Sequence, residues 1–346
     1  MDLTTTGWRR PRSSSIVSSV ILAVVMMLAG GCSGTKAPAA STSTSTTATT
    51  TTTTRPVVAS PWSPPSAAVG GSHPVTALAC PTTTFCMALN SADAAYRYNG
   101  TSWSAALAVT PPPAPSPSAA DLSCTSPTFC VAVPGDNDVV TWNGLAWVGA
   151  QSLGGAQGLQ AVGCGGGNFC AAVDGVGDGY FYNGRWSSAV NAWGGPSSIS
   201  CISSSFCMAT TGGTSEWNGR TWSQPQDVDT SGQLDTVSCT SPSFCVAADT
   251  TGNVLVWNGL SWSPGAAIDP SASDATIGNN EIVSVSCVGQ TFCMAVDSGG
   301  KALTFSGSTW SKALDIDGAT GLVAVSCATT SFCEAVDKTG RILTYT

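Results

Sequence analysis

The chain has 346 residues, only 9% of them charged, and a formal net charge of −8 at pH 7. This length suits two average domains or one larger repeat domain. No basic cluster follows the arginines at the N-terminus, which argues against a nucleic-acid partner. Abundant Gly, Ser, Thr, Pro and Ala favour a turn-rich β fold over a helical one.

The cysteine content distinguishes between disulfides, metal sites and free thiols. The chain has fifteen cysteines and a single histidine, which favours disulfides formed in an oxidising compartment. Zinc binding is the weaker interpretation, because seven pairs of thiolates would lack their other ligands. Buried free cysteines are the other alternative. We therefore predict no metal and no cofactor.

The N-terminus has the pattern of an export signal. Arginines precede an apolar run from Ile16 to Ala29 that is too short to span a membrane comfortably. The run ends in Leu28-Ala-Gly-Gly-Cys32, which resembles the bacterial lipobox. This resemblance implies that residues 1–31 are a lipoprotein signal peptide and that Cys32 is the lipidated first residue of the mature protein. An ordinary secreted protein and an uncleaved membrane anchor are the alternatives.

Residues 32–60 follow as a segment rich in Ser and Thr. This segment has no apolar periodicity, so it has nothing with which to form a core. We predict a disordered tether between the lipid and a folded domain at residues 61–346.

The folded part consists of seven copies of one repeat, with a period of about forty residues. Each copy begins with two cysteines six positions apart, separated by a short polar turn. The pairs are Cys80 with Cys86, Cys124 with Cys130, Cys164 with Cys170, Cys201 with Cys207, Cys239 with Cys245, Cys287 with Cys293, and Cys327 with Cys333. We predict that each pair forms a disulfide across a hairpin, which contributes only about 2 kcal/mol because the loop is short.

The fifth copy shows the strands most clearly. Strands are expected at Val237–Cys239, Phe244–Ala248, Asn253–Trp257 and around Trp262. Asp249-Thr-Thr-Gly252 forms the second turn, and Asn-Gly steps mark the third. A calcium site at the Asp turns is the alternative to simple turn capping, but one carboxylate per turn supplies too few ligands. The two aromatic residues of each copy are expected to pack between sheets.

Four antiparallel strands in each of seven copies predict an all-β fold, a seven-bladed β-propeller. The seventh copy stops at Leu343-Thr-Tyr-Thr346 without its final tryptophan, and an extra Trp62-Ser63 precedes the first copy. We expect this N-terminal strand to complete the last blade, which leaves no open sheet edge.

These repeats resemble a family of secreted and lipid-anchored propellers, common in actinobacteria, that carry S-C-x-S-x-x-F-C-x-A-V-D-x-x-G followed by Y/W-N-G-x-x-W-S. The resemblance covers residue 60 to the C-terminus and implies export and the propeller fold. It implies little about activity, because propellers serve many functions.

The connections between one blade and the next vary in length, so a binding site is expected on the face that carries these connections. We call this face, which also carries the Asp turns, the loop face, and the opposite one with the cysteine hairpins and Asn-Gly turns the hairpin face. The loop face gathers acidic residues around a central channel, although such aspartates also occur simply as solvated loop residues. The ligand-binding candidates are Asp227, Asp229, Asp235, Asp269, Asp274, Glu281, Asp315 and Asp317, with Trp193 as a sugar platform or a packing residue.

Catalysis has little support in the sequence. The single histidine, His73, lies outside the repeats, and no pattern pairs two carboxylates as a glycosidase needs. We expect a non-enzymatic module, anchored to the outer face of the bacterial cytoplasmic membrane, that binds an envelope protein or glycan. A carbohydrate-active enzyme using loop-face carboxylates and a purely structural envelope component are the alternatives.

Overall fold

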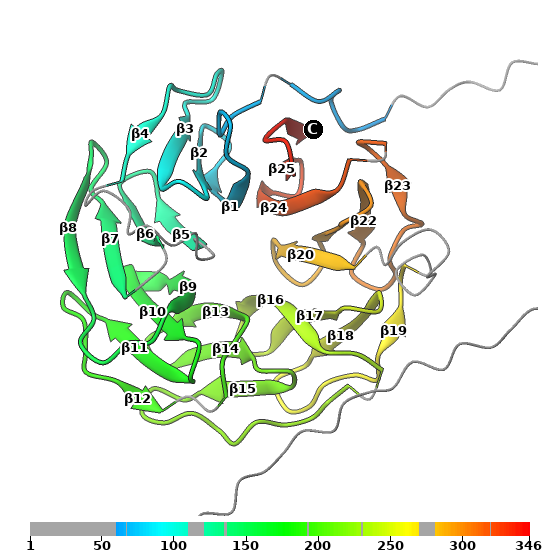
Figure 1. The fold of residues 1–346 in the computed structure, drawn as a ribbon. Coiled ribbons are helices and arrows are strands. Elements are labelled where there is room, and N and C mark those ends of the chain that lie inside the picture. Colours follow the sequence, from blue (N-terminus) through cyan, green and yellow to red (C-terminus); the bar gives the residue numbers. More distant parts are fainter. Residues whose placement is uncertain are drawn as a thin grey trace, which may run out of the picture. The chain divides into compact units, whose positions relative to one another are not determined.

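Each repeat forms one antiparallel sheet, and the seven sheets are arranged in a ring (Figure 1). The computed structural model describes residues 60–66, 68–109, 121–134, 137–191, 194–229, 231–269, 281–318 and 320–346. They belong to one compact unit, Val58–Thr346. The predicted signal peptide and nearly all of the predicted tether lie outside the described residues. The predicted all-β, seven-bladed propeller is confirmed.

The blades are numbered 1 to 7 in chain order, and each runs from an inner to an outer strand. The inner strands are β1 (Val75–Thr82), β5 (Asp121–Ser126), β9 (Leu159–Gly165), β13 (Ser198–Ser203), β16 (Leu234–Ser241), β20 (Ile282–Cys287) and β24 (Leu322–Thr329). The second strands are β2 (Phe85–Asn90), β6 (Phe129–Val133), β10 (Phe169–Asp174), β14 (Phe206–Thr210), β17 (Phe244–Asp249), β21 (Cys293–Asp297) and β25 (Phe332–Asp337). The third strands are β3 (Ala94–Tyr98), β7 (Asp138–Trp142), β11 (Asp178–Tyr182), β15 (Thr214–Trp217), β18 (Asn253–Trp257), β22 (Lys301–Phe305) and β26 (Ile342–Tyr345).

The outer strands are β4 (Leu107–Ala108), β8 (Trp147–Ser152), β12 (Val190–Asn191), β19 (Ala266–Ala267) and β23 (Leu314–Asp315). Blade 4 has no outer strand and pairs only through isolated bridges such as Thr214 with Gln226, where Pro225 can donate no ladder hydrogen bond. The outer strand of blade 5 begins at Ala266, beyond the predicted Trp262, which makes one bridge to Trp257. In the described part of the chain the one helix is the 3-10 turn η1 (Gly166–Asn168), and no helix there has the length and apolarity to span a membrane.

All seven predicted disulfides are confirmed, and each joins the first two strands of its own blade. The bonds link Cys80 to Cys86, Cys124 to Cys130, Cys164 to Cys170, Cys201 to Cys207, Cys239 to Cys245, Cys287 to Cys293, and Cys327 to Cys333. In blades 2 to 7 the two bonded cysteines are also register partners in the ladder. Each disulfide is therefore local to one hairpin and does not hold neighbouring blades together.

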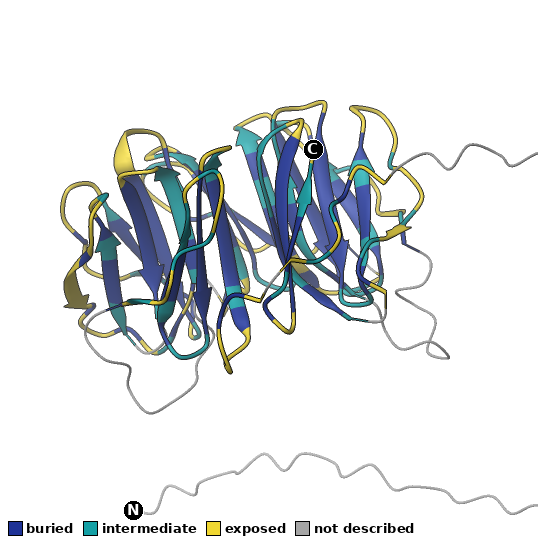
Figure 2. Ribbon diagram, turned by 90° about the horizontal axis from the view of Figure 1, so that it is seen from above, coloured by how far each residue is buried: buried dark blue, intermediate teal, exposed yellow. Residues whose placement is uncertain are grey.

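The hydrophobic core lies between blades. Leu89 of blade 1 packs with Val140 and Trp142 of blade 2, and comparable clusters fill the other interfaces. The repeat aromatics close these interfaces from outside: Tyr98 stacks on Phe332 of the preceding blade with ring centroids 6.4 Å apart. Figure 2 shows the buried residues along the strands and the exposed ones at the turns on both rims. The predicted packing of the aromatics between sheets is confirmed.

The ring closes as the two chain ends predict. Trp62 pairs with Tyr345 in an antiparallel bridge, and their rings meet edge-on at 5.4 Å. Ser63 donates its backbone N–H to the Thr344 carbonyl at 2.7 Å, and Thr344 N–H donates to the Ser63 hydroxyl at 2.9 Å. The segment around Trp62 thus supplies the outer strand of blade 7, which otherwise has three strands.

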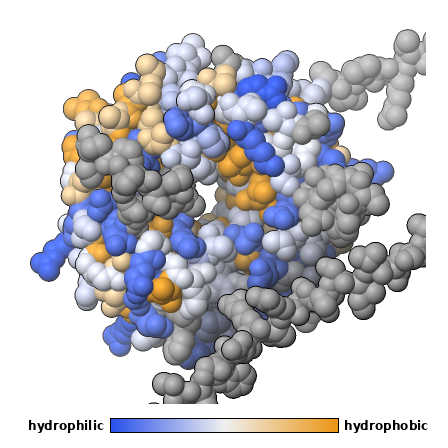
Figure 3. Space-filling model, in the orientation of Figure 1, coloured by the Kyte–Doolittle hydropathy of each residue, from blue (hydrophilic) through white to orange (hydrophobic). Residues whose placement is uncertain are grey.

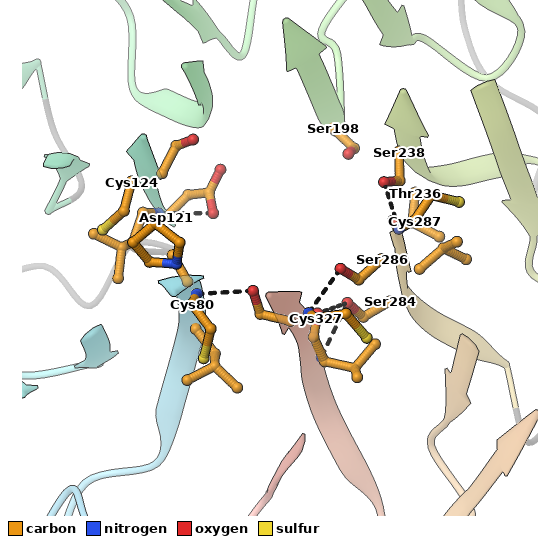
Figure 4. A pocket seen from close by; sticks show the side chains of 18 of the residues that line it. Cys80, Asp121, Cys124, Ser198, Thr236, Ser238, Ser284, Ser286, Cys287 and Cys327 are labelled. Atoms are coloured by element: carbon orange, nitrogen blue, oxygen red, sulfur yellow. Dashed lines mark hydrogen bonds between the residues drawn. The ribbon is translucent and has the colours of Figure 1, made fainter. Parts of the chain in front are cut away.

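Serine hydroxyls join neighbouring inner strands around the channel (Figure 4). The serine before a cysteine accepts the backbone N–H of the cysteine in the next blade, as Ser286 does from Cys327 at 3.0 Å. Five such bonds occur, and Ser326 to Cys80 carries the series across the seam at 2.8 Å. The Ser-Cys pair of the repeat therefore serves contact between blades.

Removing one of these acceptors should weaken the ring. We expect Ser286→Ala to lower the free energy of unfolding by about 1–2 kcal/mol, because the N–H of Cys327 loses its acceptor. Blade 1 has Ala79 at the same repeat position, so Ala79→Ser should raise stability by up to about 1 kcal/mol. Guanidinium unfolding under oxidising conditions measures both, with exposed Ser308→Ala as control. Equal losses for Ser286→Ala and Ser308→Ala would contradict the assignment.

A buried acid lies at the seam between blades 7 and 1. Glu334 is 1% exposed, and its carboxylate accepts hydrogen bonds from the Thr344 hydroxyl. Burial raises the pKa of Glu334 to about 7, against the hydroxyl's opposing effect. Its charge also contributes, after burial, to a raised pKa of Tyr98 in blade 1. Glu334 thus faces the interface that closes the ring.

An acid that binds its proton more tightly in the folded state destabilises the fold when it ionises. For Glu334 this cost develops as the pH rises from about 4.5 to about 7 and is constant above that. We compare the free energy of unfolding of Glu334→Gln with that of the parent protein. We expect this difference to be roughly 2–3 kcal/mol more in favour of the variant at pH 8 than at pH 4.5. Denaturant unfolding at both pH values measures this, and a difference that does not change with pH would contradict it.

Candidate functional site

The loop face is built on the turns between second and third strands. Asp174 is completely buried, and its Oδ1 accepts the backbone N–H groups of Val176, Gly177 and Asp178. Asp249, Asp297 and Asp337 are also completely buried and accept N–H groups at the same relative positions. Turn capping, the interpretation favoured by the sequence, is confirmed for all four.

Blades 5, 6 and 7 add a second buried carboxylate that sequence spacing did not associate with these turns. It comes from the connection that precedes the blade, as Asp229, Asp269 and Asp317. Each lies within hydrogen-bonding reach of the turn aspartate of its blade, forming the pairs Asp229–Asp249, Asp269–Asp297 and Asp317–Asp337. Three of the predicted rim acids are therefore internal, where a large partner cannot contact them.

Burial and the charge of the neighbouring carboxyl act on these pairs. Burial, together with Asp269, raises the pKa of Asp297 to about 6, while Lys301 opposes the shift. Burial, together with Asp337, raises the pKa of Asp317 to about 6, and Arg341 opposes it. Arg341 bonds Asp337 at 2.6 Å and Asp317 at 2.9 Å, so one guanidinium bridges both carboxylates.

The other predicted candidates are not brought together. Asp227, Asp235 and Asp315 are exposed at separate places on the loop face, and Glu281 is half-buried. Asp315 also caps its own loop by accepting the Gly318 N–H at 2.7 Å. Cys32, Trp193 and Asp274 lie outside the described residues. The exposed acids are therefore spread over a wide rim and form no compact pocket.

The central channel opens through the ring (Figure 3). It contains a cavity of about 500 Å³ lined mainly by the inner strands toward the hairpin face, and one of about 280 Å³ toward the loop face. Asp121 borders both, and Asp235 borders the second. Neither lining includes a lysine or an arginine. The channel is therefore a polar, negatively charged opening.

Asp121 is the channel residue that the sequence reasoning missed. Its Oδ2 accepts the Val162 N–H of the next blade at 2.8 Å, a bond that Ser198 and Ser284 make from the same repeat position in their blades. Burial raises the pKa of Asp121 to about 6, although the N–H groups of Val162 and Leu122 oppose this. Alignment of the repeats three positions before each first cysteine reveals Asp121, because the other blades have Ala, Ser or Thr there.

The arrangement suits recognition of positive charge better than hydrolysis. The paired carboxyl groups touch, whereas glycosidase pairs stand about 5–10 Å apart. His73 is exposed outside the ring of repeats. Among the described residues no group of three or more His, Cys, Asp or Glu side chains is placed to hold a metal. Exposed Arg185 and Arg220 lie at Asn-Gly turns on the hairpin face, away from the exposed acids.

Comparison with known proteins supports the fold. No protein-family model and no curated protein matches the chain. Among solved structures, one described as YCF48 bound to D1 peptide superposes with a TM-score of 0.64 and 14% identity over 83% of this chain and 97% of the other. The RRP9 WD40 repeats superpose with a TM-score of 0.68 and 10% identity over 81% and 96%. The structure of U3-55K gives 0.64 and 10% over 81% and 98%. At these identities the chain shares the propeller fold with proteins of this kind.

Proposed function

We propose that this chain is a lipid-anchored extracytoplasmic scaffold that binds a basic protein partner through its loop face. The observation that carries the proposal is the distribution of exposed charge: Asp227, Asp235 and Asp315 belong to the loop face, where they outnumber the exposed Lys338 of the blade 7 turn. The exposed Arg185 and Arg220 belong to the hairpin face. A rigid ring with variable connections is a common arrangement for binding proteins, and complementary charge speeds and orients association.

Two further observations support a protein partner. One structurally similar propeller is described as bound to a peptide, which shows that this fold accommodates peptide ligands. The channel mouth on the loop face is polar and has no cationic lining residue, so it is suited to a basic side chain. A glycan would instead be expected to require exposed aromatic platforms, and the repeat tryptophans are mostly buried in the ring.

The lipobox resemblance supports the anchor. Cys32 stands just after a small-residue ending and outside the seven disulfides. We expect the Ser- and Thr-rich segment after Cys32 to act as a tether between the anchor and the ring.

Loss of the anchoring cysteine should release the protein. We expect Cys32→Ala to abolish incorporation of an alkyne fatty acid and to move most of the protein out of the carbonate-washed membrane fraction. The parent chain should be labelled and remain with the membranes, because a diacylated or triacylated cysteine holds it there. Fatty-acid labelling of the Cys32→Ala chain at the parent level would overturn the assignment.

Neutralising the loop face should weaken partner binding. The triple change Asp227→Asn, Asp235→Asn and Asp315→Asn keeps side-chain size and the acceptor that caps Gly318, and removes three negative charges. We expect at least a tenfold loss of affinity for a partner captured from envelope extract and a smaller dependence of its Kd on salt.

The matched control lies on the other face. Arg185→Gln together with Arg220→Gln should leave partner affinity unchanged in the same binding assay. Equal binding by the parent and the triple variant would refute recognition through the loop face. Capture of a neutral glycan with unchanged affinity would place the ligand in another class.

A further inference from the structure

Blade 5 holds two buried carboxyl groups together without a cation from the described chain. Asp229 comes from the connection before the blade and Asp249 from the turn after β17, and their carboxyl groups are within hydrogen-bonding reach. Asp229 is 8% exposed and Asp249 is 0% exposed. Two such charges repel strongly where water is largely excluded. A positive charge or a proton must therefore offset them.

In the next two blades a basic side chain of the same blade offsets the charge of the carboxylate pair. The fourth residue after the turn aspartate is Lys301 in blade 6, 4.0 Å from Asp297, and Arg341 in blade 7, which bonds both carboxylates of its pair. In blade 5 this position is Asn253, whose amide donates to Asp249 Oδ2 at 2.8 Å but carries no charge. In blade 3 the fourth position is Asp178, the preceding connection supplies no acid, and the backbone N–H of Gln157 serves the second oxygen of Asp174. Blade 5 is thus a pair that lacks the cation its neighbours have.

The hydrogen-bond donors of the blade 5 pair gather on Asp249, whose Oδ1 accepts two backbone N–H groups and whose Oδ2 accepts from Thr251 and Asn253. The Ser231 hydroxyl contacts Asp229 Oδ1 and lies 3.2 Å from Asp249 Oδ2, yet its single proton serves only one of them. Asp229 Oδ2 is buried and has no hydrogen-bond partner among the described residues. Asp229 Oδ2 is therefore the carboxylate oxygen of this pair that still lacks a partner in the described part of the chain.

The surrounding atoms suit a hard cation. Beside the two carboxylates lie the Ser231 hydroxyl, which contacts both, and the Thr251 hydroxyl, which is 2.8 Å from Asp249 Oδ2. Ca²⁺ takes six to eight oxygen ligands from carboxylates, neutral oxygens and water, in flexible geometry. Mg²⁺ demands a stricter octahedron and dehydrates reluctantly. Ser231 is exposed, so water can reach the site and complete the coordination.

We propose that blade 5 binds one Ca²⁺ ion between Asp229 and Asp249, in the place that Lys301 and Arg341 serve in blades 6 and 7. One divalent ion neutralises both carboxylates and supplies the partner that Asp229 Oδ2 lacks. The objection that an Asp turn has too few carboxylates does not apply here, because the second one comes from the preceding connection. This site is separate from the proposed partner-binding function and can be tested without a partner.

The test uses the full chain, purified in detergent and freed of metal with EDTA. Calcium itself is the probe. Extracellular calcium modules have Kd values of about 10⁻⁴–10⁻³ M. We therefore expect equilibrium dialysis against 10 mM CaCl₂ to show one bound ion per chain. The Tm should rise by about 3–6 °C over the EDTA sample, because the ion binds the folded state. MgCl₂ at the same concentration should give a clearly smaller rise.

Three variants test the position of the ion. Asp229→Asn should abolish binding by removing one carboxylate. Asn253→Arg should also abolish it while preserving the fold, because it copies the solution that Arg341 provides in blade 7. Arg341→Asn should create a second site between Asp317 and Asp337 and raise the stoichiometry to two. Asp138→Asn, which removes a half-buried acid of blade 2 outside the pairs, is the matched control and should bind one ion.

The absence of bound calcium in the parent chain at 10 mM would overturn the proposal and leave a shared proton between Asp229 and Asp249 as the explanation. Binding that survives both Asp229→Asn and Asn253→Arg would also overturn it. If either variant fails to fold by circular dichroism, the other carries the test, since one deletes a ligand and the other fills the site. Loss of calcium binding with unchanged partner affinity would separate this site from the loop-face function.

Discussion

The ring depends on satisfying the backbone N–H groups that inner strands turn toward the channel. A sheet edge without acceptors is costly when buried and a risk for aggregation when exposed. Here the acceptors are mostly serine hydroxyls of the preceding blade, such as Ser238 for the Cys287 N–H at 3.0 Å. This requirement places a small polar residue before the cysteine and thereby links each blade to the next.

The same constraint explains the exceptions. Gly163 stands where blade 3 would have its serine, and a Cβ there would lie 2.8 Å from the Ile199 carbonyl oxygen. The backbones approach too closely for any side chain. Asp121 serves Val162 with one carboxyl oxygen where serine suffices in other blades, so it brings a charge into the channel that the ring itself does not require. Structural and functional demands on the inner strands can thus be separated position by position.

The fold could be predicted from the sequence because its determinants are local and repeated. Cysteine spacing, Asn-Gly steps and the Asp turn define each blade, and the stray Trp62 indicates how the ring closes. The candidate site was less predictable. Asp229 and Asp249 meet only through a connection whose length varies, so sequence distance gives no sign of their contact. Glu334 replaces an apolar residue at a single position, which a consensus of seven copies conceals.

Shared use of blade 7 by both chain ends has a consequence for biosynthesis. Ser63 and Thr344 are 281 residues apart, so during synthesis at 5–20 residues per second the first partner waits roughly 15–60 s for the second. Each cysteine hairpin, by contrast, needs only its own residues, and its disulfide can form once the hairpin reaches an oxidising compartment. The order of synthesis thus allows the blades to form one by one, whereas closure of the ring waits for the last few residues. A ribosome that stalls near the stop codon would leave every hairpin intact and the circle unsealed.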